Sequence, residues 1–137
     1  MAQVRDVMTS NPVTCSPQAS VADAAKVMAK EDIGPLPVVD ANRLVGILTD
    51  RDIVVRVVAE GRDPQSTSVG DVATSDLVTV SPDEDLSRAL QLLAERQVRR
   101  LPVAEGVTLV GVIAQADIAR QGDDSTTGQV VEQISQD

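Results

Sequence analysis

The chain contains an internal repeat. The segment VRDVMTSNPVTCSP, which starts at Val4, matches VGDVATSDLVTVSP, which starts at Val69. The same alignment, without a gap, pairs IGPLPVVDANRLVGILTDRDI from Ile33 with VRRLPVAEGVTLVGVIAQADI from Val98. An ungapped match over about 50 positions indicates two similar structural units in tandem. This feature limits the fold more than any other, because whatever fold explains one copy has to explain the other.

Each copy begins with an extended segment followed by an amphipathic helix. The extended segments are PVTCSP and LVTVSP, and Ser20 or Asp85 then stands at the N-cap position of the helix. Asp23, three residues after Ser20, adds a signal similar to a capping box. Apolar residues recur at helical spacing at Val21, Ala24, Ala25 and Met28 in the first copy and at Leu86, Ala89, Leu90 and Leu93 in the second.

A hairpin and a second helix follow in each copy. Residues 36–39 and 44–48 are apolar runs separated by the turn-rich DANR, and their counterparts are residues 101–104 and 109–113. The helix after the first hairpin has Asp50 or Asp52 in its first turn, where a carboxylate favourably meets the helix dipole. It continues through Ile53, Val54, Val57 and Val58 and ends near Gly61. The order β-α-β-β-α, taken twice, predicts an α/β fold.

The repeat also predicts the domain organisation. We expect a first repeat over residues 1–60, a linker GRDPQSTS over 61–68, a second repeat over 69–121 and a polar tail over 122–137. Val130, Val131 and Ile134 would allow one short helix in the tail. One copy of roughly 55 residues buries little surface alone, so we expect the two repeats to pack with approximate two-fold symmetry.

The composition argues against several classes of function. A net charge of −9 and a pI near 4.3 oppose binding to nucleic acid or to an anionic membrane. The chain contains no histidine and a single cysteine, Cys15, which removes the usual zinc ligands and histidine-based nucleophilic catalysis. We expect Cys15 to be a small buried residue on a strand. No aromatic residue is present, so a ligand ring would lie between aliphatic side chains.

The sequence also lacks signals for membrane insertion or export. No window approaches the roughly 18 apolar residues of a membrane span, and the N-terminal MAQVRDVMTS lacks the apolar core of a signal peptide. We therefore expect a cytoplasmic protein.

The stretch GILTDRDI, residues 46–53, carries the densest group of functional side chains. Thr49, Asp50 and Asp52 fit a metal site, a phosphate or sugar site, or the cap of the next helix. The second copy, GVIAQADI, keeps Gly111 and Asp117 but has lost the counterparts of Thr49 and Asp50. Hard cations also require about six oxygen ligands, which these residues do not supply. We therefore predict no metal site, and the choice between ligand binding and helix capping stays open.

These motifs resemble those of cystathionine-beta-synthase (CBS) domains. An LPV strand, LVG and an aspartate six residues after the glycine occur twice at the same spacing. The resemblance runs from Val4 to about Arg120 and implies two CBS repeats that form a Bateman module. The layout, with LTDRDIV and QVRRLPV, is similar to that of small stand-alone bacterial stress-response members of the family.

The resemblance implies a regulatory function. Paired CBS domains generally bind AMP, ADP, ATP, S-adenosylmethionine or NAD in clefts between the repeats, and they typically dimerise. We therefore expect an adenosine nucleotide as ligand, a homodimer and an unidentified protein partner, with no required cofactor.

The resemblance also assigns candidate ligand-binding residues. In the family, the aspartate of the motif holds the ribose hydroxyls and the hydroxyl residue contacts ribose or phosphate, which implies these roles for Asp52 and Thr49. Asp117 corresponds to Asp52, but Ala114 replaces the threonine. Basic residues before the LPV strand contact phosphate in the family, which implies Arg99 and Arg100, with Arg51 as a weaker third. Base contacts are implied for Val13, Thr14, Ser16, Leu36 and Pro37, and for Val78, Thr79, Ser81, Leu101 and Pro102.

A simpler interpretation exists for each charged candidate. Asp52 and Asp117 fit helix starts, where a carboxylate contributes about 0.3–1 kcal/mol through the dipole. Arg99 and Arg100 follow the end of a helix, where cations are favourable without any ligand.

Three functions therefore remain to be compared. The first is a sensor that couples a nucleotide to a partner, and the second is a ligand-independent dimerisation or interaction scaffold with degenerate sites. An enzyme is the third, and it is disfavoured because no nucleophile has a positioned base.

Overall fold

The computed structural model describes residues 2–121, and these form two compact units. The first-repeat unit consists of residues 13–77, and the second-repeat unit consists of residues 2–12 together with residues 78–121. Each unit is α/β, as the sequence predicts. The predicted tail over 122–137 lies outside the described residues.

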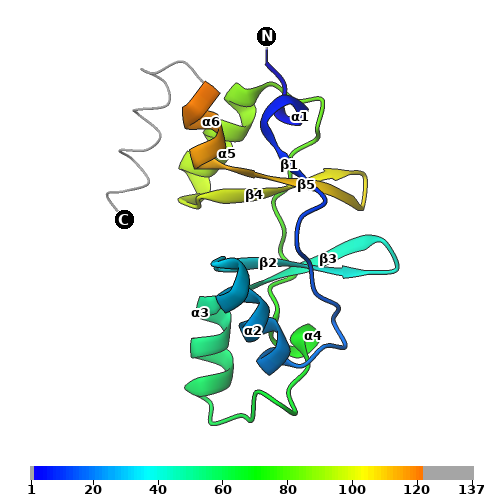
Figure 1. Cartoon of the computed structure of the whole chain (residues 1–137), viewed down its shortest axis with the longest axis vertical. Helices are drawn as coiled ribbons and strands as arrows, with labels where there is room; N and C mark the ends of the chain where they lie inside the picture. Colours follow the sequence, from blue (N-terminus) through cyan, green and yellow to red (C-terminus); the bar gives the residue numbers. More distant parts are fainter. Residues whose placement is uncertain (1, 122–137) are drawn as a thin grey trace. The chain divides into compact units, whose positions relative to one another are not determined.

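The first-repeat unit is a β-hairpin with helices on one side. Helix α2 (Val21–Glu31) leads into β2 (Pro35–Asp40) and β3 (Arg43–Thr49), which pair antiparallel with a bulge at Val38/Val39. Helix α3 (Asp50–Ile53) follows at once and continues as a π-helix, η1 (Val54–Val58). A short helix, α4 (Val69–Val72), completes the unit, and the helices lie on one face of the hairpin (Figure 1).

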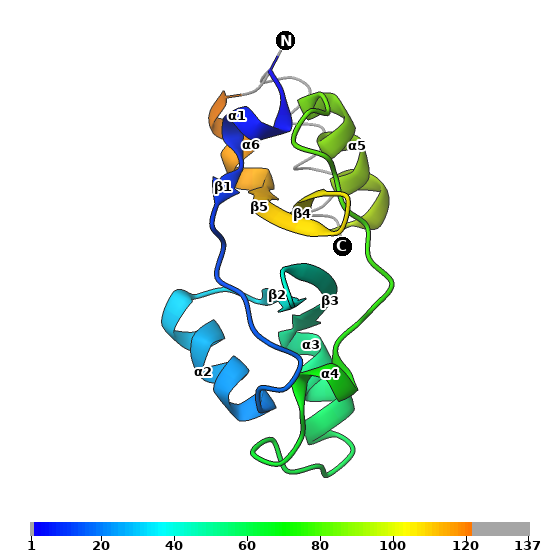
Figure 2. The ribbon, with the colours of Figure 1, turned by 90° about the vertical axis from the view of Figure 1, so that its right-hand side faces the viewer.

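The second-repeat unit has the same plan. Helix α5 (Leu86–Arg96) leads into β4 (Arg100–Glu105), β5 (Thr108–Ala114) and α6 (Gln115–Gln121). Helix α1 (Val4–Val7) and strand β1 (Thr9–Ser10) belong to this unit, and its sheet has the order β1-β5-β4. Its helices also lie on one face of the sheet, as a second view confirms (Figure 2).

The cores confirm the predicted apolar faces. In α2, Val21, Ala24 and Met28 are buried beneath the hairpin, and in α5 the buried residues include Leu86, Ala89, Leu90 and Leu93. The two predicted hairpins are also present. Ser20 caps α2 through its hydroxyl, which accepts a hydrogen bond from the Asp23 amide at 3.0 Å. Asp85 occupies the N-cap position of α5, but its side chain makes no capping hydrogen bond.

The opening segment of each repeat lies in the unit of the other repeat. Val4 and Val7, from the start of the chain, are buried in the core around α5, β4 and β5. Their counterparts Val69 and Val72 are buried in the core around α2 and β2. The sequence repeats and the compact units are therefore different sets of residues, and the short helices α1 and α4 that carry these valines are not among the predicted elements.

The shared glycine of the LVG motif allows this exchange. The amide of Ile47 donates to the carbonyl of Thr74 at 2.9 Å, so residues 73–74 run directly beside Gly46. A Cβ at Gly46 would lie 3.0 Å from the Thr74 carbonyl oxygen, and a Cβ at Gly111 would lie 2.8 Å from the Thr9 carbonyl oxygen. Both glycines are thus required by the close approach of another backbone.

Candidate functional site

The start of α3 is a complete capping box built from two predicted site residues. The hydroxyl of Thr49 accepts a hydrogen bond from the Asp52 amide at 3.1 Å, and Oδ2 of Asp52 accepts one from the Thr49 amide at 2.9 Å. This reciprocal arrangement satisfies two amides that the helix itself leaves unpaired. The helix-cap alternative is therefore confirmed for Thr49 and Asp52, while the ribose role of Asp52 stays a prediction.

The second carboxylate oxygen of Asp52 is also occupied. The Thr74 hydroxyl donates to Oδ1 of Asp52 at 3.3 Å, and the guanidinium Nε of Arg56 lies 3.9 Å from the same atom. Arg56 in turn donates to the Val72 carbonyl at 3.0 Å. Only 11% of the Asp52 side chain is exposed, so the carboxylate is held mainly by the protein itself.

Sequence reasoning did not identify Thr74 or Arg56 as neighbours of Asp52. Arg56 carries a usable signal, because it follows Asp52 by four residues on one helix face. Thr74 carries none, because it reaches Asp52 only through the exchange of opening segments between the repeats.

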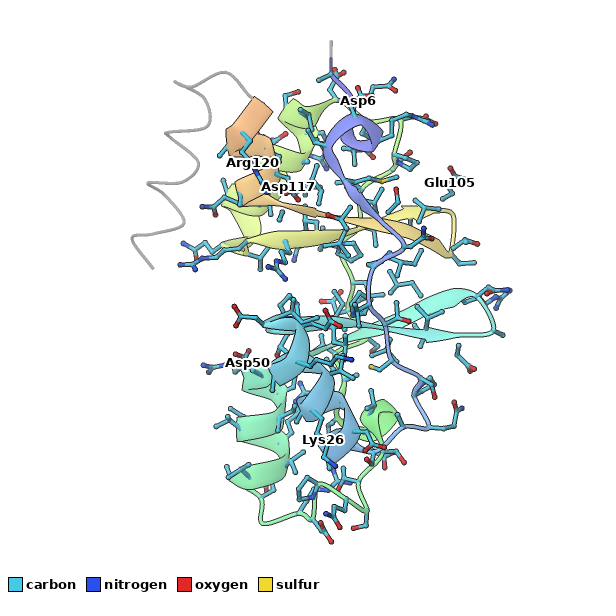
Figure 3. The ribbon with its side chains drawn as sticks, viewed as in Figure 1. Asp6, Lys26, Asp50, Glu105, Asp117 and Arg120 are labelled. Atoms are coloured by element: carbon cyan, nitrogen blue, oxygen red, sulfur yellow. The ribbon has the colours of Figure 1, made fainter. Side chains whose placement is uncertain are left out.

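Asp117, the counterpart of Asp52 in the second-repeat unit, has different bonding partners. Asp117 has no capping box, because Ala114 carries no hydroxyl. Its carboxylate instead forms an ion pair with Arg120, with 2.7 Å between Nη2 and Oδ1, and 21% of its side chain is exposed. Asp117 and Arg120 lie together on α6 (Figure 3). Of the two aspartates, Asp117 is therefore the more accessible to a ligand.

The predicted phosphate ligands Arg99 and Arg100 lie at the corner where β4 begins. Arg100 stands directly across from Ala114 in the β4/β5 pair, and the Arg99 carbonyl accepts a hydrogen bond from the Gln115 amide at 2.8 Å. Both arginines are exposed, and neither forms an ion pair with another residue between 2 and 121. The start of α6, which carries Asp117, is thereby joined to the two arginines.

The first-repeat unit has no arginine at the two positions that correspond to Arg99 and Arg100. Gly34 and Pro35 take the places of Arg99 and Arg100, and the Gly34 carbonyl accepts from the Asp50 amide at 3.2 Å. Asp50 stands at the exposed start of α3 (Figure 3). Arg51, the weaker phosphate candidate, follows it and is exposed.

The predicted base-contact segments lie beside the LPV strands within each unit. The Cys15 amide donates to the Pro37 carbonyl at 3.0 Å, and the Val80 amide donates to the Pro102 carbonyl at 3.2 Å. These bonds place the exposed Val13, Thr14 and Ser16 next to β2, and Val78, Thr79 and Ser81 next to β4. The side chains of Leu36 and Leu101 are buried in the cores, so a ligand would meet their backbone.

Cys15 was expected to be buried on a strand, but it is only half-buried and forms an isolated parallel bridge to Val38 of β2 outside any named strand. Burial raises the pKa of its thiol to about 11. The thiol is therefore protonated near neutral pH and is a poor nucleophile.

The described residues form neither a metal-binding cluster nor a membrane-spanning helix. Residues 2–121 contain no group of three or more cysteine, aspartate and glutamate side chains placed to hold a metal ion. No helix in this range is both long enough and apolar enough to span a membrane.

The chain is similar to known proteins over nearly its whole length. The CBS domain model matches residues 4–59 and 69–124. The chain is 40% identical over 136 residues to the CBS domain-containing protein YhcV of Bacillus subtilis, covering 98% of this chain and 96% of that protein. It is 36% identical over 135 residues to Hypoxic response protein 1 of Mycobacterium tuberculosis, covering 98% and 94%.

Solved structures of similar proteins include ligand complexes. A structure of Hypoxic Response Protein I with two coordinated zinc ions has a TM-score of 0.81 and 36% identity, covering 89% of this chain and all of that one. CBSX2 in complex with AMP has a TM-score of 0.77 and 29% identity, covering 88% and 95%. The CBS domain pair of MJ0100, in complex with 5′-methylthioadenosine and S-adenosyl-L-methionine, has a TM-score of 0.75 and 27% identity, covering 88% and 94%.

Proposed function

Because this chain belongs to the family of proteins built from CBS domains, we propose that it is a regulatory module that binds an adenosine-containing ligand. The ligand class includes AMP, ADP, ATP, S-adenosylmethionine and NAD. Binding would favour one conformation of the protein, and a partner that prefers that conformation would respond to the ligand. In this proposal the chain is not an enzyme and requires no cofactor.

One observation carries the proposal. In the second-repeat unit, a partly exposed carboxylate, Asp117, belongs to the same corner as Arg99 and Arg100. A carboxylate accepts charge-assisted hydrogen bonds from ribose hydroxyls, and arginines bind phosphate through paired donors. The corner therefore combines the two chemistries that a nucleoside phosphate requires.

The comparisons support the ligand class. CBSX2 is solved with AMP, and the MJ0100 domain pair is solved with 5′-methylthioadenosine and S-adenosyl-L-methionine. These ligands share the adenosine group and differ at the 5′ position. For this chain we propose that Val78, Thr79, Ser81 and the backbone of β4 contact the base, and that Val13, Thr14, Ser16 and the backbone of β2 do so in the other unit.

We also propose that the protein is a homodimer. Val54, Val55 and Val58 form an apolar stripe on η1 and are 58%, 46% and 65% exposed. Their counterparts in the second repeat include Ala119 and Arg120, so the stripe belongs to one repeat only. Because one patch can pair with its own copy across a two-fold axis, we propose a second chain as its occupant.

The composition of the chain makes a direct test of ligand binding simple. The chain has no aromatic residue, so absorbance near 260 nm from the purified protein reports a bound nucleotide without interference. Mass spectrometry of the small molecules released on denaturation identifies the ligand. Calorimetric titration of the stripped protein with AMP, ADP, ATP, S-adenosylmethionine and NAD then measures each affinity.

Variants connect the titration to the site. Asp117→Asn is expected to weaken the best ligand at least tenfold, since it removes a charged acceptor of ribose hydroxyls. Asp40→Asn removes the same charge at the exposed far end of β2 and serves as the matched control. The absence of any bound or titratable adenosine compound would contradict the proposed function.

The alternative is a ligand-independent interaction scaffold. It is favoured by the state of Asp52, whose two carboxylate oxygens are already bonded within the protein. It predicts that protein partners recovered with the full chain are the same in the presence and absence of every adenosine compound in the panel.

A further inference from the structure

We infer that the two units select adenosine ligands by charge. The second-repeat unit would take a 5′-phosphorylated nucleoside, and the first-repeat unit would take an adenosine derivative with no 5′-phosphate. This inference rests on the proposed function and adds to it the chemical difference between the two ligands.

The first observation is a reciprocal exchange across the paired strands. In the β2/β3 pair, Pro35 stands opposite Thr49. At the same position of the β4/β5 pair, Arg100 stands opposite Ala114. Side chains directly across an antiparallel pair lie on one face about 4.5–5.5 Å apart at Cβ. One unit therefore offers a hydroxyl without a cation there, and the other offers a cation without a hydroxyl.

The second observation concerns the residue before each strand. The carbonyls of Gly34 and Arg99 accept equivalent hydrogen bonds from the amides of Asp50 and Gln115, which shows that the two corners have the same backbone plan. A Cβ at Gly34 would lie 3.4 Å from Oδ1 and 3.5 Å from Oδ2 of Asp50. A carboxylate therefore covers the place from which the Arg99 side chain extends in the other unit.

The third observation is the difference in corner charge. The first-repeat corner contains Asp50 and Asp52 against Arg51 and Arg56, which sum to no net charge, and Arg56 is engaged by Asp52 and the Val72 carbonyl. The second-repeat corner contains Arg99, Arg100 and Arg120 against Asp117, which leaves two positive charges. At contact distance near a protein surface, each unit charge changes the affinity for phosphate by about tenfold or more.

An unpaired polar atom also marks the second-repeat corner. Oε1 of Gln115, the residue in the place of Asp50, is buried and accepts no hydrogen bond from any residue of the described range. Buried polar atoms are nearly always paired in native proteins. The Gln115 side chain is neutral, so, unlike Asp50 in the other unit, it adds no charge that repels phosphate.

The test compares AMP with 5′-methylthioadenosine, which have the same base and ribose. Both are titrated into the stripped full-length protein by calorimetry, and ¹H–¹⁵N spectra assign the site. AMP is expected to shift the amides of Leu101 and Ala114 at low concentration. 5′-Methylthioadenosine is expected to shift those of Gly34 and Thr49 first.

Variants that remove one charge test the ligand preference of each unit separately. Arg100→Gln is expected to weaken AMP at least tenfold and to change the affinity for 5′-methylthioadenosine less than twofold. Asp50→Asn is expected to strengthen AMP binding in the first-repeat unit about tenfold, because it removes the repelling carboxylate. Arg88→Gln on α5 and Asp40→Asn remove the same charges elsewhere and are expected to change neither affinity more than twofold.

Three outcomes would overturn the inference. One is AMP binding with equal affinity in both units, and another is Asp50→Asn leaving AMP affinity unchanged. The third is AMP bound in the first-repeat unit and lost with Arg51→Gln, which would make Arg51 a phosphate ligand. In each case the proposed function stands, since an adenosine compound is bound. Absence of binding by every adenosine compound would refute both.

Discussion

The Thr49 hydroxyl gives the sharpest test of the capping box at the start of α3. In Thr49→Ala, the Asp52 amide loses its acceptor at 3.1 Å, while the return bond from the residue 49 amide to Asp52 Oδ2 at 2.9 Å remains. Replacing a hydroxyl N-cap with alanine typically costs about 1 kcal/mol, with a range of about 0.5–2. Because half of the box survives, we expect a loss of about 1 kcal/mol in the free energy of unfolding. The melting temperature should fall by about 3–5 °C.

The second repeat supplies the reciprocal experiment. Ala114 occupies the same position before α6, so Ala114→Thr adds a hydroxyl next to the amide of Asp117. We expect a gain of about 0.5 kcal/mol. The gain is smaller than the loss in Thr49→Ala, because Arg120 already holds the Asp117 carboxylate that would complete the box.

The assay follows from the composition. With no aromatic residue, intrinsic fluorescence is absent, so urea unfolding is followed by circular dichroism in the far ultraviolet. The protein is first stripped of bound nucleotide, because any ligand of the native state adds stability by mass action. Thr49→Ser keeps the hydroxyl and is expected to stay within about 0.5 kcal/mol of the parent chain. Equal stability of Thr49→Ala and Thr49→Ser would refute the assigned role of the hydroxyl.

Three further predictions concern packing, reactivity and assembly. Gly111→Ala places a Cβ 2.8 Å from the Thr9 carbonyl oxygen, and thermal unfolding should show a loss of about 1–3 kcal/mol in stability. Gly46→Ala places its Cβ 3.0 Å from the Thr74 carbonyl oxygen and should cost less. Unchanged stability in both variants would contradict the close approach of the backbones. Burial raises the pKa of the Cys15 thiol to about 11 from 9.0. Alkylation by iodoacetamide at a pH of about 8 should therefore be about a hundredfold slower in the folded protein than in urea. The folded state should also lose stability as the pH rises above 9.0, since the thiol of the unfolded chain ionises first. Equal alkylation rates in the folded and unfolded protein would refute the burial of the thiol. Val55→Asp should convert the proposed homodimer to a monomer, as measured by light scattering. Val107→Asp, at an exposed turn of the other unit, should leave the dimer intact. A dimer that survives Val55→Asp would exclude the apolar stripe on η1 as its interface.

Much of this protein is determined locally by its sequence. The repeat, the helical spacing from Val21 to Met28 and the turn-rich DANR predicted the long helix, the hairpin and the following helix of each repeat, but not α1, β1 or α4. These signals act over a few residues, through side-chain periodicity and backbone conformation, so they can be followed along the chain. The roles of Thr49 and Asp52 as helix-cap residues were among the predicted alternatives for the same reason.

Tertiary structure decided what depends on contacts between distant segments. Each repeat contributes its opening segment to the unit of the other. The sequence pattern alone does not reveal this exchange, because Val4 and Val69 fit either of two similar cores equally well. That exchange places Thr74 beside Asp52, where the Thr74 hydroxyl donates a hydrogen bond to Oδ1 of the carboxylate. Asp117 is the more exposed aspartate, with 21% of its side chain exposed against 11% for Asp52. The sequence determined which residues could serve in a binding site, and the packing of the chain decided which of them remain accessible.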